Sequence, residues 1–177
     1  VASDQLVDCS GWATRDLDAR VLRVNPAVDP RQIFSDDPLR ILRMVRFAAV
    51  LDFDVEVATL TAALQEQHRT SIIAAERIQG EGMRMIDHGR LSKALSLIVE
   101  WNLETGLGTH SDLGVTAGLA RLEAARSQPE HTIHELDLES WRILCLAMWL
   151  HPELNRLGGL KLPRQLSDRV ERIVCGH

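Results

Sequence analysis

Apolar and polar positions follow a helical period along most of this chain after about residue 30. Apolar side chains recur every three to four positions, which is the spacing of one face of an α-helix. Glycine, proline and small polar residues interrupt the pattern between the helical stretches. The predicted helices are residues 38–51, 58–67, 72–86, 90–103, 112–126, 139–151 and 163–175. The sequence therefore predicts an all-α fold of about seven helices.

Two segments near the N-terminus have an extended pattern instead, residues 5–9 and 21–24. They are too short to form a sheet alone. We interpret them as a short β remnant of a sheet whose other strands are absent from the chain. In the C-terminal half, Trp141, Leu146 and Trp149 have the helical spacing of core residues.

The apolar runs, the first residues and the cysteines exclude several classes of protein. No apolar run approaches the roughly 20 residues that a membrane helix needs, and the first residues lack the basic start and apolar stretch of a signal peptide. We therefore expect a cytoplasmic protein with no membrane partner. Cys9, Cys145 and Cys175 form no CxxC pair, so we expect reduced, mostly packed thiols and neither a disulfide framework nor a zinc site.

The charge balance limits how the protein could bind RNA. It has 20 Lys and Arg against 25 Asp and Glu, a net charge of −5. This argues against a protein that grips nucleic acid by bulk electrostatics, so any RNA contact must be local. Only Lys93 and Lys161 are lysines, which leaves 18 arginines among the 20 basic residues. Arginine suits bidentate recognition of phosphates and base edges, but the codon bias of a GC-rich genome gives the same skew.

The helix predicted at residues 38–51 is apolar around most of its circumference and should be largely buried. Arg40, Arg43 and Arg46 lie three apart in its narrow polar stripe, so each guanidinium group is rotated by only about 60° from the last. A buried guanidinium without a partner is very costly. These side chains must therefore meet carboxylates, carbonyls, a solvent-filled cleft or an anionic ligand.

The start of this helix allows two interpretations. In the structural one, Asp37 is the N-cap, Pro38 is the first helical residue, Asp36 favours the helix dipole and the arginines form internal salt bridges. In the functional one, Asp37 and Arg40 lie one turn apart and present an acceptor beside a donor fork. Cytosine and adenine carry a ring-nitrogen acceptor next to an amine donor. The pair matches these two bases and mismatches uracil and guanine.

Residues 35–49, Ser-Asp-Asp-Pro-Leu-Arg-Ile-Leu-Arg-Met-Val-Arg-Phe-Ala-Ala, resemble the neck of the bacterial-type tRNA CCA-adding enzymes and poly(A) polymerases. The motif of that family reads EDxxR and is commonly EDPLRILRAVRFAA. Asp36 replaces the usual Glu, which leaves the base-reading Asp37 and Arg40 in place. The resemblance implies a nucleotide-binding site formed by Asp37, Arg40 and Arg43, with Asp36 and Arg46 in supporting roles.

A second resemblance lies upstream of this motif. Residues 11–17 and 21–23 resemble the flexible-loop motif of the family, GGxxDLxxxxLR, in which Asp16 is the supporting acid and Trp12 replaces the second glycine. Asp16 and Asp18 have the spacing of a metal-binding DxD pair. Because they fall inside the loop motif, we interpret them as loop residues.

A third resemblance lies downstream. Glu76, Arg77 and Glu81 match the ERIxxEL motif, in which an acid-rich helix braces the nucleotide-selecting helix. The resemblance therefore gives these three residues supporting roles. Gly80 and Gly82 depart from the motif and should weaken the helix by about 1 kcal/mol each relative to alanine.

The resemblance implies three parts of the chain: residues 1–28 as a remnant of the catalytic head domain, 29–103 as the nucleotide-selecting neck and 104–177 as the helical body. It implies ATP, CTP and the 3′ end of tRNA or another RNA as partners. The Gly-Ser motif, DxD pair and Arg-Arg-Asp motif of the head are absent. Mg²⁺ would therefore be held by the missing head, and we expect this chain alone to have no catalytic residue, no metal ligand and no activity.

Several alternatives stay open at the level of the sequence. CCA addition, CC-only or A-only addition and poly(A) synthesis share this neck. A non-catalytic helical RNA-binding or protein-interaction module, in which Asp37 and the arginines are structural, is the rival from another class. His131 and His134 are three apart, but Pro129 precedes them and no third metal ligand is near.

Overall fold

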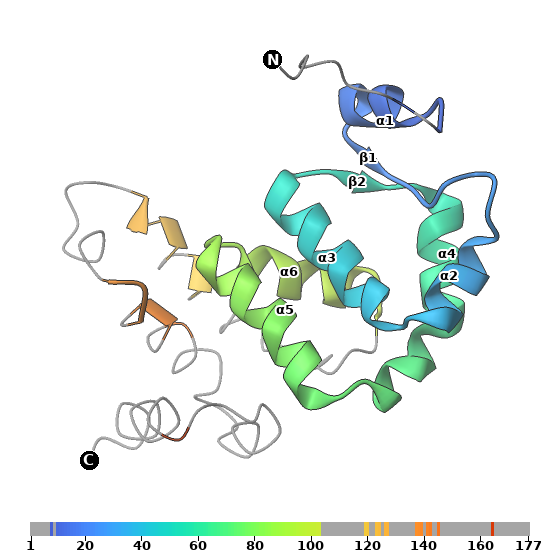
Figure 1. The fold of residues 1–177 in the computed structure, drawn as a ribbon. Helices are drawn as coiled ribbons and strands as arrows, with labels where there is room; N and C mark the ends of the chain where they lie inside the picture. Colours follow the sequence, from blue (N-terminus) through green and yellow to red (C-terminus); the bar gives the residue numbers. More distant parts are fainter. Residues whose placement is uncertain are drawn as a thin grey trace, which may run out of the picture.

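The helical architecture predicted from the sequence is confirmed. The computed structural model describes residues 8, 10–103, 119, 120, 123, 124, 126, 127, 137–139, 141, 142, 145 and 164. Their elements follow one another as α1 (Ala13–Ala19), β1 (Val21–Leu22), α2 (Pro30–Asp36), α3 (Leu39–Leu51), β2 (Asp54–Val55), α4 (Val57–Glu66), the 3₁₀ helix η1 (Gln67–Ile72), α5 (Ala75–Asp87) and α6 (Leu91–Glu100) (Figure 1). The described part is all-α with one small sheet.

Helix α3 lies at the centre of this arrangement, between the α2–α4 pair on one side and α5 and α6 on the other (Figure 1). Its sequence buries seven residues, which are Leu39, Ile41, Leu42, Met44, Val45, Ala48 and Ala49. Apolar residues of α5 and α6 join them in one core, including Met85, Ile86, Leu91, Leu95 and Ile98. Burial of this apolar surface is the main term that holds α3 in place.

The small sheet corrects our interpretation of residues 21–24. Strand β1 pairs in parallel with β2, with Val21 opposite Asp54 and Leu22 opposite Val55. The partner strand therefore lies in the chain itself, directly after α3, where two residues are too few to show a strand period in the sequence. Asp52 ends α3 in the left-handed conformation, with φ of 59°, and turns the chain into β2. The extended segment predicted at residues 5–9 lies largely outside the described residues.

Helix α1 occupies residues that we had interpreted as part of a flexible loop. It buries none of its residues, so it has no apolar period to detect. Polar side chains start it instead: Ser10 Oγ accepts from the N–H groups of Trp12 and Ala13 at 3.0 and 3.1 Å. The Asp8 carboxylate accepts from Thr14 N–H at 3.2 Å. Hydrogen bonds, first from the Ser10 side chain, lower the pKa of Asp8 to about 2.

Helix α2 was also absent from the predicted set. Asp29 accepts from Arg31 N–H at 3.0 Å and caps it, and Pro30 occupies its first turn. The helix buries only Phe34. Its start signal was present in the sequence, but seven residues with one buried side chain give no amphipathic pattern.

Predicted helices after residue 111 lie mostly outside the described residues. The described residues within them, such as Leu119, Glu139 and Arg164, are helical. Trp141 and Cys145 are buried, as expected of core residues, whereas Leu146, Trp149, Cys9 and Cys175 are outside the described set. Cys145 is a free thiol, and burial raises its pKa to about 12.

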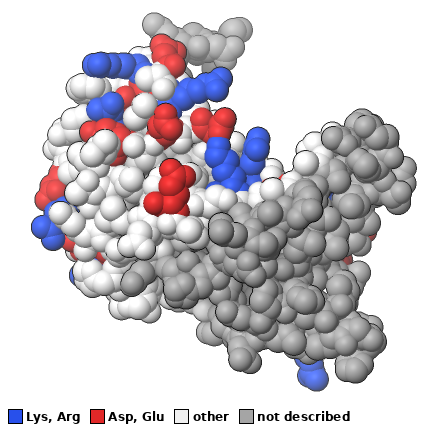
Figure 2. Space-filling view, turned by 180° about the vertical axis from the view of Figure 1, so that it is seen from behind, with Lys and Arg blue, Asp and Glu red and all other residues white. Residues whose placement is uncertain are grey.

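Charges on the surface are interleaved. Figure 2 shows the face opposite to that of Figure 1, where Lys and Arg side chains lie next to Asp and Glu side chains, especially toward the α1 end. This face therefore carries no continuous basic surface among the described residues, in keeping with the net charge of −5. None of the described helices is long and apolar enough to cross a membrane.

Candidate functional site

The break between α2 and α3 exposes the side chains that the sequence singled out. Asp37 has φ of −140° and ψ of 91°, an extended conformation. The residue before a proline is driven out of the helical region because the proline ring clashes with it. Pro38 thus ends α2 at Asp36, and α3 restarts at Leu39. One residue of extended backbone places Asp37 at the junction of two helices.

The structural interpretation of this junction is wrong for the roles of Asp37 and Asp36, whereas the internal salt bridges that it expected are present for Arg40 and Arg46. The Asp37 carboxylate makes no cap hydrogen bond to α3, and its backbone carbonyl accepts from Arg40 N–H at 3.0 Å instead. Asp36 belongs to the last turn of α2, where a carboxylate opposes the helix dipole. Its side chain accepts from Gln32 Nε2 at 2.5 Å.

The Asp37 carboxylate faces α5. It accepts from Arg77 Nη2 at 3.2 Å through Oδ1 and at 3.5 Å through Oδ2. Arg40 Nε lies 3.9 Å from Asp37 Oδ2, which is an ion pair without a hydrogen bond. A carboxylate has about four acceptor positions. Asp37 therefore keeps capacity for a further donor, and the guanidinium of Arg40 donates no hydrogen bond to the described residues.

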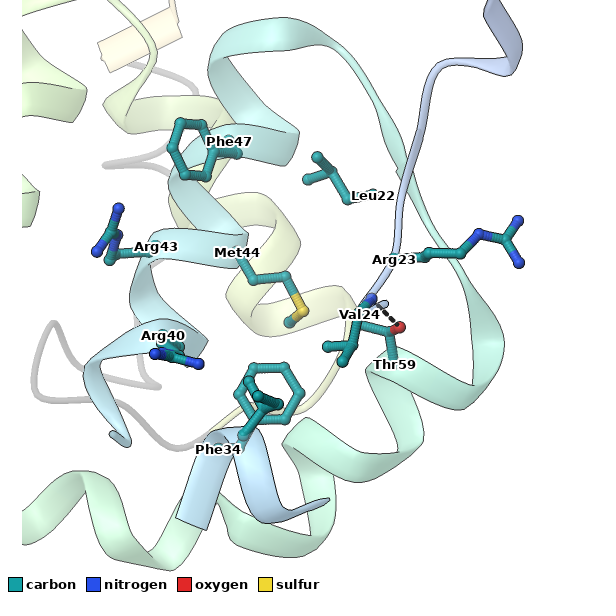
Figure 3. A pocket seen from close by; sticks show the side chains of 10 residues that line it. Leu22, Arg23, Val24, Phe34, Arg40, Arg43, Met44, Phe47 and Thr59 are labelled. Carbon is teal, nitrogen blue, oxygen red and sulfur yellow. Dashed lines mark hydrogen bonds between the residues drawn. The ribbon is translucent and has the colours of Figure 1, made fainter. Parts of the chain in front are cut away.

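Arg40 and Arg43 border a cavity of about 370 Å³. It is lined by Leu22, Arg23, Val24, Ile33, Phe34, Arg40, Arg43, Met44, Phe47 and Thr59. In Figure 3 the two guanidinium groups lie on one side, and Phe34, Met44 and Phe47 form an apolar wall. Asp37 is outside this lining, although it is adjacent to Arg40. The cavity is largely apolar, with three arginines at its border, of which Arg23 is paired with Asp16.

Arg46 differs from the two arginines before it. Its Nε donates to Glu81 Oε2 at 2.6 Å, and the exposed fractions of the two side chains are 12% and 4%. Arg84 donates to the other oxygen of Glu81 at 2.8 Å. Helix α5 runs through Gly80 and Gly82 without a break. It contacts the junction through Arg77 and the far half of α3 through Glu81.

Two supporting residues lie elsewhere. Glu76 is exposed in the first turn of α5. Asp16 in α1 accepts from Arg23 Nε through both oxygens at 2.9 Å. It therefore positions Arg23, which lines the cavity.

Trp12 joins this support, which the sequence did not predict. The guanidinium groups of Arg15 and Arg23 both lie against its ring, at 5.0 and 4.8 Å from the ring centroid. Its only signal in the sequence was that it replaces a glycine of the loop motif.

The described acidic residues form no cluster that could bind a metal ion. No group of three or more His, Cys, Asp or Glu side chains within the described part could hold a metal ion. These residues therefore do not fit the role of an Mg²⁺ site.

Comparison with known proteins gives the family. No family model matches the chain. The CCA-adding enzyme of Limosilactobacillus fermentum is 33% identical over 148 residues, which cover 82% of this chain and 35% of that enzyme. The chain belongs to the family of the CCA-adding tRNA nucleotidyltransferases. A CC-adding tRNA nucleotidyltransferase of Geobacter sulfurreducens is 44% identical over 85 residues, or 48% of this chain and 19% of that protein.

The chain spans only part of such relatives, between 19% and 37% of their own lengths. Solved structures agree on the fold. A tRNA-processing enzyme in its apo form 2 has a TM-score of 0.74 at 22% identity, covering 95% of this chain and 49% of that one. A tRNA-processing enzyme with CTP has a TM-score of 0.68 at 21% identity, covering 93% and 47%.

Proposed function

We propose that this chain supplies the base-selecting part of an enzyme that adds nucleotides to the 3′ end of tRNA or another RNA. Support comes from its membership of the CCA-adding family and from the junction between α2 and α3. There, a donor fork on Arg40 and an acceptor on Asp37 lie side by side, and neither is saturated by the described residues. This unsaturated pair is the observation that carries the proposal.

The pair fits two of the four bases. Arg40 can donate to the ring nitrogen of cytosine or adenine while Asp37 accepts from the neighbouring amine. Uracil and guanine present a ring N–H to the guanidinium and a carbonyl to the carboxylate, so both contacts are repulsive. CTP and ATP are therefore the proposed nucleotides. Arg43 lies one turn further along the border of the cavity and supplies a second cation for the anionic nucleotide.

Contacts with α5 hold the junction between α2 and α3 and leave Arg40 and Asp37 able to bind a base. Arg77 binds Asp37 from α5, and the pair of Arg46 and Glu81 fixes α3 against the same helix. Preorganised donors and acceptors lose less entropy when a ligand binds. The base would then meet an edge whose geometry is set before binding.

Catalysis needs a further part in this proposal. Nucleotidyl transfer is a phosphoryl transfer that metal ions assist when they are bound by carboxylates, and the described residues present no such cluster. Mg²⁺ held by a catalytic head domain is therefore part of the proposal, as is a cytoplasmic location. The 177-residue chain should not incorporate labelled CTP or ATP into tRNA by itself.

The test is the Arg40→Ala variant in an enzyme that joins this segment to a catalytic domain. A good bidentate base contact contributes about 1–3 kcal/mol of discrimination, so the preference for CTP and ATP over UTP and GTP should shrink roughly tenfold to hundredfold. The measurement is kcat/KM for all four nucleotides, with thermal melting as the control for folding. An equal loss with every nucleotide and a lower melting temperature would show that Arg40 is only structural.

A further inference from the structure

A second pocket lies away from the proposed nucleotide site, between the turn that joins α5 to α6 and five later residues, Ala120, Glu123, Ala124, Arg126 and Ser127. Its volume is about 490 Å³. It is lined by Asp87, His88, Gly89, Arg90, Ser92, Ala120, Glu123, Ala124, Arg126 and Ser127. We refer to these residues as the α5–α6 pocket. Its lining is rich in charged and polar side chains, in contrast to the apolar wall beside Arg40.

The two acids of the α5–α6 pocket already have partners. Both oxygens of Asp87 accept from Arg142, at 2.8 Å from Nε and 2.7 Å from Nη2. Glu123 accepts from the hydroxyl of Ser92 at 2.5 Å and from its N–H at 3.3 Å, and so caps the start of α6. Neither carboxylate is paired with Arg90 or Arg126 among the described residues.

The guanidinium group of Arg126 has a donor that no acceptor among the described residues satisfies. Its guanidinium lies over the ring of Trp141, 4.4 Å from the centroid. Its Nη1 is buried and has no hydrogen-bond partner. A buried donor that lost its water and gained no acceptor is unfavourable, which makes this atom a ready site for an anion.

Arg90 is the second cation of the pocket. It precedes α6 and is exposed. In the described part of the chain its side chain forms no ion pair or hydrogen bond. With Arg142, the described residues of the α5–α6 pocket and its flank thus have three guanidinium groups against two carboxylates. The excess is local, in a protein whose net charge is −5.

We propose that the α5–α6 pocket binds a backbone phosphate of the RNA substrate through Arg90 and Arg126. Guanidinium groups offer planar pairs of N–H donors that match phosphate oxygens. Trp141 is buried and covered by Arg126, so base stacking on it is not part of the site. This inference rests on the proposed RNA substrate, but it concerns residues that have no part in base selection.

The experiment measures the Kd of the 177-residue chain for tRNA by fluorescence anisotropy over a series of salt concentrations. The test variant combines Arg90→Gln with Arg126→Lys, since lysine keeps a charge over Trp141 but loses the planar fork. We expect roughly tenfold weaker binding, because hydrogen bonds to charged groups are among the stronger ones. The slope of log K against log salt should fall by about one, as for one lost phosphate contact.

Arg84→Gln is the matched control, because it removes one arginine from α5, the helix that leads into the pocket, at a position outside the pocket lining. If it weakens tRNA binding as much as the test variant does, binding is diffuse and the inference is wrong. Unchanged binding by the test variant, or no binding by the wild-type chain, overturns it as well. Circular dichroism and melting curves check that each variant is folded.

A second arm separates RNA from free anions. If inorganic phosphate raises the melting temperature of the wild type but not of the test variant, while both bind tRNA equally, the pocket takes a free anion and not RNA. The assay contains no nucleotide. Failure of base selection would instead appear as unchanged selectivity in Arg40→Ala, with the tRNA result standing.

Discussion

Arg40 and Arg43 lie in the first half of α3, and Arg46 lies in the second half. The arginine side chains are exposed in the first half, and the one in the second half is mostly buried against a carboxylate. The exposed fraction of the Arg40 side chain is 46%, and its nearest carboxylate is 3.9 Å away. The exposed fraction of Arg46 is 12%, and its carboxylate partner is 2.6 Å away. The helix period alone does not separate them, since all three fall on one arc.

The difference follows from what packs opposite each half. Helix α5 presents the buried carboxylate of Glu81 to Arg46, whereas the first half borders the open cavity. A buried cation with a close partner stabilises the fold, because its loss leaves a desolvated charge. A cation without a close partner can instead bind an anionic or hydrogen-bonding ligand. The comparison shows that Arg46 has a buried partner, whereas Arg40 and Arg43 border the cavity, as the proposed role in base selection requires.

The largest expected effect tests the structural half. Glu81→Ala leaves Arg46 without its partner in a mostly buried position. Breaking a buried pair in this way costs about 3–5 kcal/mol, and we expect a value near the lower end because Arg46 retains some contact with solvent. The measurement is the free energy of unfolding from urea denaturation.

The control for this prediction uses the other oxygen of the same carboxylate. Arg84→Ala removes a partner whose side chain is 58% exposed, so the free energy of unfolding should fall by less than about 1 kcal/mol. Equal losses in the two variants would mean that Arg46 is not held by Glu81 in the way described.

A smaller effect is expected at the contact between the two helices. Arg77→Ala removes the hydrogen bonds to Asp37 but leaves Arg40 in place. Exposed ion pairs contribute about 0–1 kcal/mol, so stability should change little. In the enzyme with its catalytic domain, kcat/KM for CTP and ATP should fall by about fivefold or less as Asp37 loses its fixed orientation.

Arg77→Lys is the companion variant and should restore part of the loss, since it keeps a donor near Asp37. The prediction fails if Arg77→Ala reduces selectivity as strongly as Arg40→Ala, because Arg77 would then contact the base itself.

Part of the geometry of the candidate site could be predicted from the sequence. The positions of Asp37, Arg40 and Arg43 followed from a motif inside a strongly periodic helix, and the need of Arg46 for a partner followed from burial. Local signals could not show that Asp37 turns toward Arg77, because the two residues are 40 positions apart. The same limit hid the β1–β2 pairing, which joins segments on either side of α2 and α3.

The smallest effect concerns α1, which the sequence presented as a loop. Because α1 buries no residue, we expect Trp12→Ala to leave the global melting temperature unchanged. The ring of Trp12 contacts the guanidinium groups of Arg15 and Arg23, and each exposed cation–π contact contributes about 0.5–1 kcal/mol. Its loss should open α1 locally.

Hydrogen exchange of the α1 amides measures this opening, and their protection should fall about fivefold to thirtyfold if both contacts are lost. Trp12→Phe, which keeps an aromatic ring against the two guanidinium groups, should lose less protection. Arg23 also borders the cavity beside Arg40, and Asp16 binds it independently of the ring. The nucleotide site should therefore tolerate the change. A fall in the global melting temperature, or lost protection in α3, would mean that α1 is part of the cooperative core and not a polar attachment to it.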